Sequence, residues 1–474
     1  MGVLLHSVAQ AQGCPLALVG GLVRDTFLDK PSALDDWDVI VPHGQSLPFA
    51  HALAKASQRK VIVLDEALGI ARVVISSARL LAVLQHTSPL LYRQCDLSHS
   101  LPDVFTVDVA PTLLGETPAA QGSTEASTPW EALQGDLGRR DFTINAMVMI
   151  LTPWPGAPAQ SNLPQLLDPF GGGQDLAQGR LHQVAASNFL SDPLRVVRAY
   201  RFLATLPSPQ PPTLSPDTTT ALKTAAPFMP KVAGERLWQE WQKLLEGRWA
   251  VEAFASMLTD GTLLPCVGLQ AEGLSQESAT PLRLCLAQWQ AIATLEHAQE
   301  NHLDGAVLGL SLWGGLRLAC LVQALYTVDE TLPNILAARW HWGREGQKLV
   351  AFLDKPFPGT ETLSTQYDWL ITLQQYPGLA IAMASLPCID DATVFWDRVQ
   401  HVEGLFAKLL APPLLESTDV MALTGLPPSE ALGQCLAALK KAQVLGEVSS
   451  RETAIAWLRQ DGMAHAGAKP NPHQ

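Results

Sequence analysis

The chain is poor in charged residues, and the charge that it carries is mostly negative. Only 16% of its 474 residues are charged, against about a quarter in an average globular protein. The 32 basic residues are outnumbered by 45 acidic ones, which gives a formal net charge of −13. This balance excludes a strongly basic protein that binds nucleic acid non-specifically. Any contact with nucleic acid must come from a locally basic strip on an acidic chain.

Paired cysteines and long apolar runs are also missing. The seven cysteines are scattered and none forms a CxxC pair, which argues against a zinc cage or a disulfide framework and favours a reducing compartment. No apolar stretch reaches the ~18 residues of a membrane span. The first residues lack the basic segment and the apolar run of a signal peptide. We therefore expect a cytoplasmic protein that does not associate with membranes.

Apolar residues make up 47% of the chain, and their periodicity changes near residue 187. Before that point short apolar runs alternate with helix-like segments, which predicts a mixed sheet with helices. These runs cover 17–19, 37–41, 61–64, 71–76 and 104–110. After it, apolar residues recur at i, i+3, i+4 and i+7, so the rest should be helical. The clearest helical segments are 193–205, 234–247, 249–260, 281–298, 303–326 and 345–354.

The first candidate site combines two glycines with two aspartates. Asp36 and Asp38 are two apart on a predicted strand, so both carboxylates lie on one face with Cα atoms about 6.6 Å apart. Such oxygen ligands suit Mg²⁺ that carries nucleotide phosphates. Gly20 and Gly21 stand where a strand turns into a helix, a favourable place for a phosphate, and Arg24 adds a charge-assisted contact. Alone, each feature fits an ordinary turn or a solvated strand edge; together they predict a triphosphate and metal site.

Asp108 is the candidate third carboxylate of this site. It lies mid-strand among apolar neighbours in VFTVDVAP, where an unpaired carboxylate is costly and needs a partner or a metal. The alternative is an aspartate bonded to the backbone at a strand end.

The second candidate site is the motif RRDFTINAM. Arg139 and Arg140 suit phosphate or ribose oxygens, and Asp141 suits sugar hydroxyls. Asn145 lies one helical turn after Asp141, on the same face. In the structural alternative, Asp141 caps a helix whose apolar residues pack inward. Both interpretations can hold together.

The third candidate site is the helix predicted for DPLRVVRAYRF. Pro193 suits the first helical position, which makes Asp192 the expected N-cap. Arg195 and Arg198 follow at intervals of three, so Arg195 lies beside Asp192. An acceptor beside a planar donor fork complements the base edges of cytosine and adenine and rejects guanine and uracil. The alternative is an ordinary salt bridge on a helix surface.

Together these residues resemble the class II tRNA nucleotidyltransferase and bacterial poly(A) polymerase family, part of the polymerase-β-like superfamily. The matches occur in the family's order. They are LVGGLVRD with DWDV (18–41), RRDFTINAM (139–147), LDPFGGGQDLAQGRLHQV (167–184), DPLRVVRAYRF (192–202) and VAGERLWQEWQKLL (232–245). Two positions depart from the family: Ser191 replaces a usual Glu before Asp192, and Asp35 stands where a basic residue often precedes the acidic pair.

The resemblance implies an α+β, polymerase-β-like nucleotidyltransferase head followed by an all-α neck, body and tail. The expected boundaries are 1–186 for the head, 187–250 for the neck, 251–400 for the body, 401–462 for a tRNA-binding tail and 463–474 for a disordered end. The insertion at 111–131 is longer than usual in the family. The neck is locally basic, with eight Lys and Arg against five Asp and Glu over 191–248. In the tail, Lys440 and Lys441 either meet tRNA phosphates or lie on a solvated helix face.

The resemblance also implies template-independent addition of C and/or A from CTP and ATP to tRNA 3′ ends. Asp36 and Asp38 then bind Mg²⁺, and Asp108 is the third expected catalytic residue. The expected nucleotide-binding residues are Gly20, Gly21, Arg24, Arg139, Arg140, Asp141, Asn145, Asp192, Arg195 and Arg198. The alternatives are a poly(A) polymerase, an enzyme that adds only CC or only A and, more remotely, an inactive RNA-binding relative.

Overall fold

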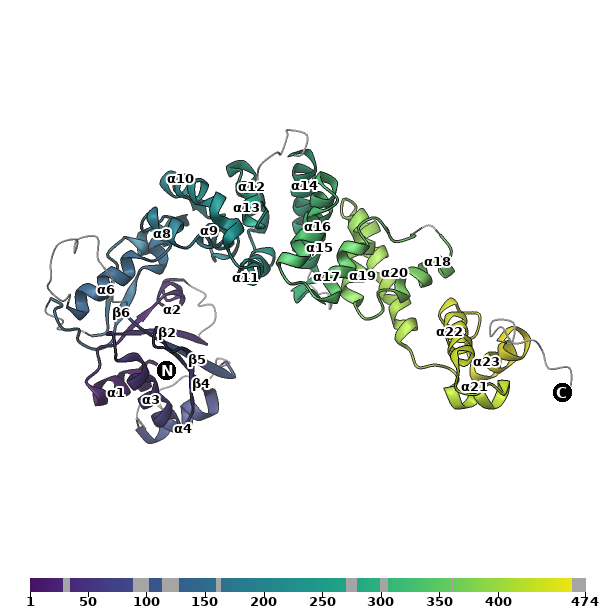
Figure 1. The fold of residues 1–474 in the computed structure, drawn as a ribbon, viewed down its shortest axis with the longest axis horizontal. Coiled ribbons are helices and arrows are strands. Elements are labelled where there is room, and N and C mark those ends of the chain that lie inside the picture. The colour runs from purple at the N-terminus through teal and green to yellow at the C-terminus, as the bar shows by residue number, and fades with distance from the viewer. Residues whose placement is uncertain are drawn as a thin grey trace. The chain divides into compact units, whose positions relative to one another are not determined.

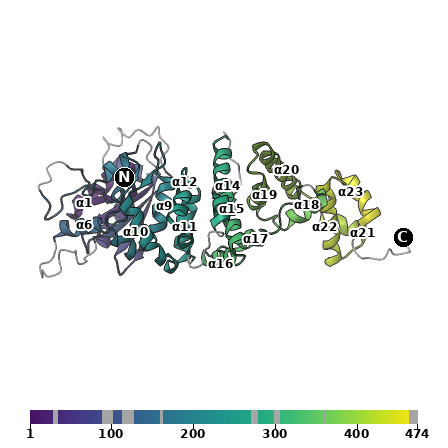
Figure 2. The ribbon, with the colours of Figure 1, turned by 90° about the horizontal axis from the view of Figure 1, so that it is seen from above.

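The computed structural model describes residues 1–28, 35–87, 102–112, 128–158, 163–269, 279–298, 306–359 and 361–462. The chain divides into two compact units, Met1–Met229 and Pro230–Gln474 (Figures 1 and 2). Two features expected from the sequence lie wholly or largely outside the described residues: the end at 463–474 and most of the insertion at 111–131.

A seven-stranded mixed sheet organises the first unit, in the order β3-β4-β5-β2-β1-β6-β7. β2 and β5 run parallel, and every other neighbouring pair is antiparallel. β2 therefore lies between the parallel strand β5 and the antiparallel strand β1. The strands are β1 (Ala17–Val19), β2 (Asp36–Val41), β3 (Val61–Asp65), β4 (Ile70–Ser76), β5 (Val104–Pro111), β6 (Val148–Ile150) and β7 (Gln165–Leu167).

The two faces of this sheet bury separate sets of apolar side chains, as the two-residue period of a strand requires. On β1, Leu18 joins the core formed with α1, α3 and α4. Its neighbours Ala17 and Val19 point the other way, into a core with α6. Figure 1 shows α1, α3 and α4 gathered on one side of the strands. These helices are α1 (Gly2–Gln12), α3 (Ser46–Ser57), α4 (Ser77–Thr87) and α6 (Pro129–Gly138).

Short elements complete the first unit around one end of the sheet. A 3₁₀ turn, η1 (Thr143–Asn145), precedes β6, and a small parallel pair joins β8 to β9. α10 begins after Ser215, whose hydroxyl accepts the Thr218 N–H, with Pro216 at its first position. The remaining elements are α2 (Gly21–Asp25), α7 (Gly172–Ala177), β8 (Arg180–Leu181), α8 (Ser187–Ser191), α9 (Arg195–Thr205), β9 (Thr213–Leu214), α10 (Pro216–Ala225) and η2 (Ala226–Lys231).

The second unit is helical apart from one hairpin, within its described residues. Its last helices, α21 to η4, bury a core of their own around Val420, Cys435 and Ala454. No helix in the described ranges has the length and apolar character needed to cross a membrane. The elements are α11 (Gly234–Leu245), α12 (Ala250–Asp260), α13 (Leu263–Cys266), α14 (Ala279–His297), β10 (Ala306–Val307), β11 (Leu310–Ser311), α15 (Leu312–Val328), α16 (Leu332–Arg339), α17 (Arg344–Ala351), α18 (Leu363–Ile371), α19 (Pro377–Ser385), η3 (Leu386–Cys388), α20 (Ala392–Leu410), α21 (Ser417–Thr424), α22 (Glu430–Leu445), α23 (Arg451–Trp457) and η4 (Leu458–Gly462).

The predicted fold class is confirmed: a mixed-sheet head is followed by a mostly helical remainder. The helix predicted over 303–326 is wrong in its first part, because 306–311 forms the β10–β11 hairpin. Leu308 and Gly309 occupy its two-residue loop with φ of 54° and 80°. Positive φ at both loop positions is the geometry of a tight hairpin turn, which ends the helix pattern there.

Candidate active site

The β1–β2 pairing brings the two glycines against the acidic pair. Val19 lies opposite Asp38 in the register, so Gly20 follows directly beside that carboxylate. Gly20 has φ of 75°, and a Cβ built on it would lie 2.7 Å from Asp38 Oδ2. Any side chain at this position would collide with the carboxylate. Glycine is therefore what allows the turn before α2 and Asp38 to approach so closely.

Asp36 and Asp38 lie on one face of β2. Both are exposed, whereas Trp37 between them is half-buried against the core. The surrounding protein raises the pKa of Asp38 by desolvation, although its side chain reaches solvent. The Arg140 guanidinium opposes this rise in pKa, and the negative charges of Asp108 and Asp36 add to it. The carboxylates are thus close enough to feel one another's charge.

Asp108 lies beside Asp38 and is bound by an arginine. The two aspartates are directly opposite in the parallel β2–β5 register. Arg72 on β4 lies opposite Asp108 and donates Nε at 2.7 Å and Nη2 at 2.8 Å to its two oxygens. The partner of Asp108 is therefore a guanidinium, not the backbone. Arg72 is the residue that the sequence analysis missed, although a lone charge in the apolar run IARVVIS was a signal for it.

The carboxylates of β2 fit a divalent cation. Within the described residues, no hydrogen bond or ion pair engages the side chains of Asp36 and Asp38, and the buried Oδ1 of Asp35 has no hydrogen-bond partner. No set of three or more His, Cys, Asp or Glu in the described ranges is arranged to hold a metal ion. Mg²⁺ is commonly held by one or two carboxylates together with substrate phosphates, so two exposed carboxylates beside the glycine turn suit it.

Asp141 is buried and joins two distant segments. Its Oδ1 accepts hydrogen bonds from the Phe142 N–H at 2.9 Å and from Asn145 Nδ2 at 3.0 Å. Its Oδ2 accepts two from Arg198 on α9, at 3.0 and 2.8 Å. Burial raises the pKa of Asp141, but the Arg198 charge and these hydrogen bonds outweigh it and lower the pKa below its ordinary value. Both oxygens thus face protein donors, in addition to the predicted role toward sugar hydroxyls.

Arg24 extends this network to the turn at Gly20 and Gly21. It donates Nη1 to Asn145 Oδ1 at 3.1 Å and Nε to Asp25 at 2.7 Å. Its guanidinium also lies 5.4 Å from the centre of the Phe202 ring on α9. The side-chain amide of Asn145 and the buried carboxylate of Asp141 therefore link three segments that are far apart in the sequence. These segments are α2, η1 and α9.

The paired arginines of the second motif stand at the end of α6. Arg140 donates to the Asn145 carbonyl at 3.2 Å and to Asp136 at 3.3 Å, and its charge reaches Asp38. Arg139 is the C-cap of α6. The predicted helix after Asp141 is only the three-residue turn η1. Its apolar neighbours are buried as the structural interpretation expects, namely Phe142, Ile144 and Met147.

The third motif differs from its prediction at the cap. α9 begins at Arg195, not at Pro193, so Asp192 is not its N-cap. Residues 192–195 form a turn in which the Arg195 N–H donates to the Asp192 carbonyl at 3.1 Å. Arg195 also donates to the Asn188 carbonyl at 3.1 Å. Burial lowers the pKa of Arg195, and the charges of Asp141 and Asp192 oppose that shift. The paired role of Asp192 and Arg195 stays a prediction.

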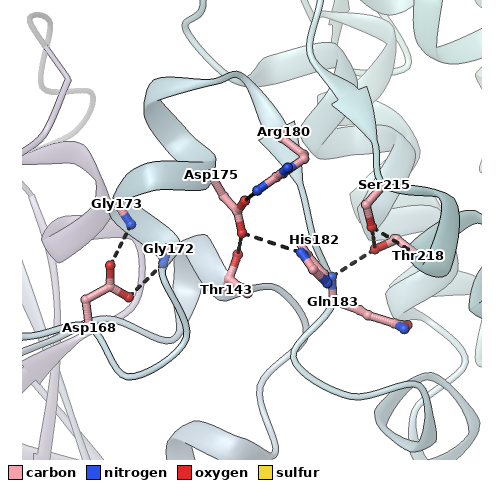
Figure 3. A network of polar contacts seen from close by, with 10 residues as sticks. All are labelled: Thr143, Asp168, Gly172, Gly173, Asp175, Arg180, His182, Gln183, Ser215 and Thr218. Carbon is pink, nitrogen blue, oxygen red and sulfur yellow. Dashed lines mark hydrogen bonds and ion pairs between the residues drawn. The ribbon is translucent and has the colours of Figure 1, made fainter.

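The motif 167–184 contacts η1 through Thr143 (Figure 3). Asp168 caps α7 by accepting the N–H groups of Gly172 and Gly173 at 2.7 and 2.8 Å. A Cβ on Gly172 would lie 2.2 Å from the Thr143 carbonyl oxygen, so glycine permits this contact. Buried Asp175 accepts the Thr143 hydroxyl at 2.7 Å and is paired with Arg180, which donates at 2.7 Å. The sequence analysis quoted this motif without assigning roles to its aspartates.

The two tail lysines bind within the protein. Lys441 donates to both oxygens of Asp368, at 2.7 and 2.8 Å. Lys440 donates to the carbonyls of Lys408 and Ala411. Neither side chain lies on a purely solvated face, and their expected role toward tRNA phosphates stays a prediction.

Comparison with known proteins agrees with the fold and with these motifs. Residues 16–182 match the family model described as "Poly A polymerase head domain", and residues 213–267 match "Probable RNA and SrmB- binding site of polymerase A". The chain is 28% identical to the CC-adding tRNA nucleotidyltransferase of Synechocystis sp., over 94% of this chain and 93% of that protein. It is 28% identical to the CC-adding tRNA nucleotidyltransferase of Geobacter sulfurreducens, over 96% and 94%.

Solved structures share the fold. A CCA-adding enzyme in its apo form I aligns with a TM-score of 0.62 at 17% identity, covering 97% of this chain and 93% of that one. The head thus has the fold of a nucleotidyltransferase, with an acidic pair beside a glycine turn. The chain thus contains the head and RNA-binding domains of the poly(A) polymerase family, and its homologues are tRNA nucleotidyltransferases, as its motifs indicated. Members of this family are enzymes and generally use divalent metal ions.

Proposed function

We propose that this protein adds C and/or A from CTP and ATP to the 3′ end of tRNA, without a nucleic-acid template, in a Mg²⁺-dependent reaction. The observation that carries the proposal is the closeness of Asp38 to the glycine turn, where a Cβ on Gly20 would meet its Oδ2 at 2.7 Å. A carboxylate beside a turn that binds phosphate contributes little to the stability of the fold. Its chemical role is to bind a cation that a bound triphosphate also coordinates.

Each group of residues has a separate role in the proposed reaction. Asp36 and Asp38 hold Mg²⁺, which when bound lowers the pKa of the 3′ hydroxyl and offsets the charge of the triphosphate. The turn at Gly20 and Gly21 receives phosphate oxygens, and the charge of Arg140 favours the same anion. The 3′ oxygen attacks the α-phosphorus in line and pyrophosphate leaves, so no covalent enzyme intermediate is needed. The remaining residues of the motifs orient these groups or contact the nucleotide. They are Arg24, Arg139, Asp141, Asn145 and Arg198.

The base is selected by Asp192 and Arg195 in this proposal. The turn that precedes α9, in which the Arg195 N–H donates to the Asp192 carbonyl, supports it, because an acceptor and a donor fork on one turn match cytosine and adenine. Replacement of Asp192 by alanine should therefore relax base choice. The test is to measure addition with each of the four nucleotides. An unchanged preference for C and A over G and U would show that Asp192 does not select the base.

The metal role is tested by Asp36→Ala and Asp38→Ala. Each variant should lose nucleotide incorporation into tRNA that lacks its CCA end, and should keep the circular dichroism spectrum of the parent. Asp397→Ala is the matched control, because Asp397 is exposed on α20 and belongs neither to a motif nor to the segment 213–267 that matches an RNA-binding domain. EDTA should abolish parental activity, and added Mg²⁺ should restore it. Parental activity in the Asp38 variant would overturn the assignment.

A second candidate is addition of CC alone, and the two relatives named above favour it. Both are CC-adding enzymes that align along more than nine-tenths of their length. Incubation with tRNA ending at the position before CCA, and with tRNA ending in CC, separates the cases. Failure to add A to the second substrate would identify a CC-adding enzyme, and a long ladder with ATP alone would identify a poly(A) polymerase. We retain the division into head, neck, body and tail as part of the proposal.

A further inference from the structure

β3 forms one edge of the seven-stranded sheet, and its side chains are open on both faces. It pairs with β4, and no other strand in the described ranges pairs with it. None of its five residues is buried, whereas β4 beside it buries three. Ile62 and Val63 are each 48% exposed, and Leu64 and Leu68, in the strand and in the turn after it, are each 49% exposed. Because successive residues of a strand point to opposite faces, apolar surface is open on both sides of this edge.

This composition is unusual for an unpaired edge. The free N–H and C=O groups of an edge strand can pair with another strand, and proteins commonly prevent this with very short strands or with charged side chains. The opposite edge, β7, has three residues and none of the large exposed apolar side chains of the described chain. In β3, four apolar residues follow one another from Val61 to Leu64, and charged residues stand only at the two ends of this run.

The charges at the two ends of β3 have opposite signs. Arg59 and Lys60 precede the apolar run, and Asp65 and Glu66 follow it. An antiparallel pair with a second copy, centred on Val63, places Lys60 of each copy opposite Glu66 of the other. Opposite charges at directly opposed positions stabilise a strand pair, and like charges destabilise it. A parallel pair in register would place like charges opposite each other, so the antiparallel arrangement is favoured.

We propose that β3 is the contact surface for a second copy of this chain, which pairs with it antiparallel across a two-fold axis at Val63. Such an interface uses the same surface on both copies and must therefore be self-complementary, as the charge order of β3 is. A β-bulge between Val63 and Asp65 limits the length of the regular edge. Because the paired stretch is short, the dimer should be weak and should depend on concentration.

The test measures the oligomeric state of the full-length protein by sedimentation equilibrium, at concentrations from about 1 μM to about 100 μM. Val63→Lys places two like charges opposite each other at the two-fold axis. Val63 is preferred to Ile62, because Ile62 lies opposite Arg72 and hence on the face of the sheet that carries Asp108. Val394→Lys is the matched control, since Val394 is 45% exposed and lies on α20 in the second unit.

The parent should equilibrate between monomer and dimer, and Val63→Lys should raise the dissociation constant of the dimer by roughly tenfold. Val394→Lys should dimerise like the parent. Circular dichroism verifies that both variants are folded. A parent that stays monomeric throughout this range, or a Val63→Lys protein that dimerises like the control, would overturn the proposal.

A charge reversal tests the antiparallel register and includes a recovery of binding. Lys60→Glu places two negative charges opposite each other at both ends of the paired stretch, and should weaken the dimer by roughly tenfold at low salt. Lys60→Glu together with Glu66→Lys makes the opposed charges complementary again. This double variant should return the dissociation constant to within about twofold of the parent value. A double variant that is as weak as Lys60→Glu would rule out the proposed pairing.

Amide hydrogen exchange tests whether another segment of the same chain covers the edge instead. In dilute, monomeric protein the outward amides of β3 should exchange quickly, and they should become protected when the protein dimerises. Outward amides that are already protected in the monomer would show that the edge is covered from within, and would contradict the proposal. None of these measurements uses a nucleotide or tRNA, so their outcome is independent of the proposed function.

Discussion

Substitution of Gly20 by alanine probes the contact between the glycine turn and Asp38. Gly20 has φ of 75° and ψ of −144°, a region that essentially only glycine adopts. Holding alanine there costs about 1–3 kcal/mol of folding free energy. The new Cβ would lie 2.7 Å from Asp38 Oδ2, whereas ordinary contact begins at 3.4 Å, so the carboxylate must retreat by about 0.7 Å. Misplacement of a catalytic group by about 1 Å lowers the rate by roughly 100-fold.

The assay is single-turnover addition of labelled CTP to tRNA lacking its CCA end, together with thermal unfolding. Gly13→Ala is the matched control: Gly13 also has positive φ, 60°, but a Cβ on it meets nothing within 4 Å. Both variants should unfold a few degrees below the parent, because both hold alanine in a strained conformation. Only Gly20→Ala should lose the rate of addition. Equal rates in the two variants would refute the argument that Asp38 and the turn form one site.

Two charge substitutions give further expectations. Arg198→Met should destabilise the first unit by about 3–5 kcal/mol at pH 7.5 in urea unfolding, because it leaves the Asp141 carboxylate buried without a cation. Arg198 lowers the pKa of Asp141, so the stabilisation exists above the ordinary pKa of about 3.9 and is lost as pH falls through the lowered pKa of the folded state. The loss caused by the substitution should shrink only below about pH 3.9, as Asp141 takes up a proton; an equal loss at pH 7.5 and at about pH 2 would contradict this. Arg72→Met should cost less than about 1 kcal/mol, because its ion pair is partly exposed. Its charge lowers the pKa of Asp38, so the acid limb of the rate profile should move to higher pH, and an unmoved limb would count against the role of Asp38.

Sequence patterns within a single strand or helix predicted those parts of the site that lie on one secondary-structure element. Alternation along β2 placed Asp36 and Asp38 on one face and Trp37 on the other, because a strand has a period of two. The five apolar runs of the head were all strands, with ends that differ by one residue at most. The rule for helix caps was wrong at Asp192, because the chain turns once more before α9 begins.

Contacts between elements could not be predicted in this way. The pairing of Arg72 with Asp108 depends on the antiparallel register of β4 and β5, which no local pattern specifies. The four hydrogen bonds of Asp141 likewise depend on α9 lying beside η1. In both cases the residue types were informative, since a charge among apolar neighbours needs a partner, but the partner's identity comes from the tertiary structure.

The buried carboxylate of Asp141 limits how this protein can be recombined with its relatives. Arg24, Asn145 and Arg198 reach it or one another from positions spread over the first 200 residues. A chimaera that imports only α9 from another enzyme would bring an arginine whose geometry was fitted to a different partner. The smallest exchangeable piece is therefore the set of segments linked through Asp141, namely α2, η1 and α9, which should be exchanged together.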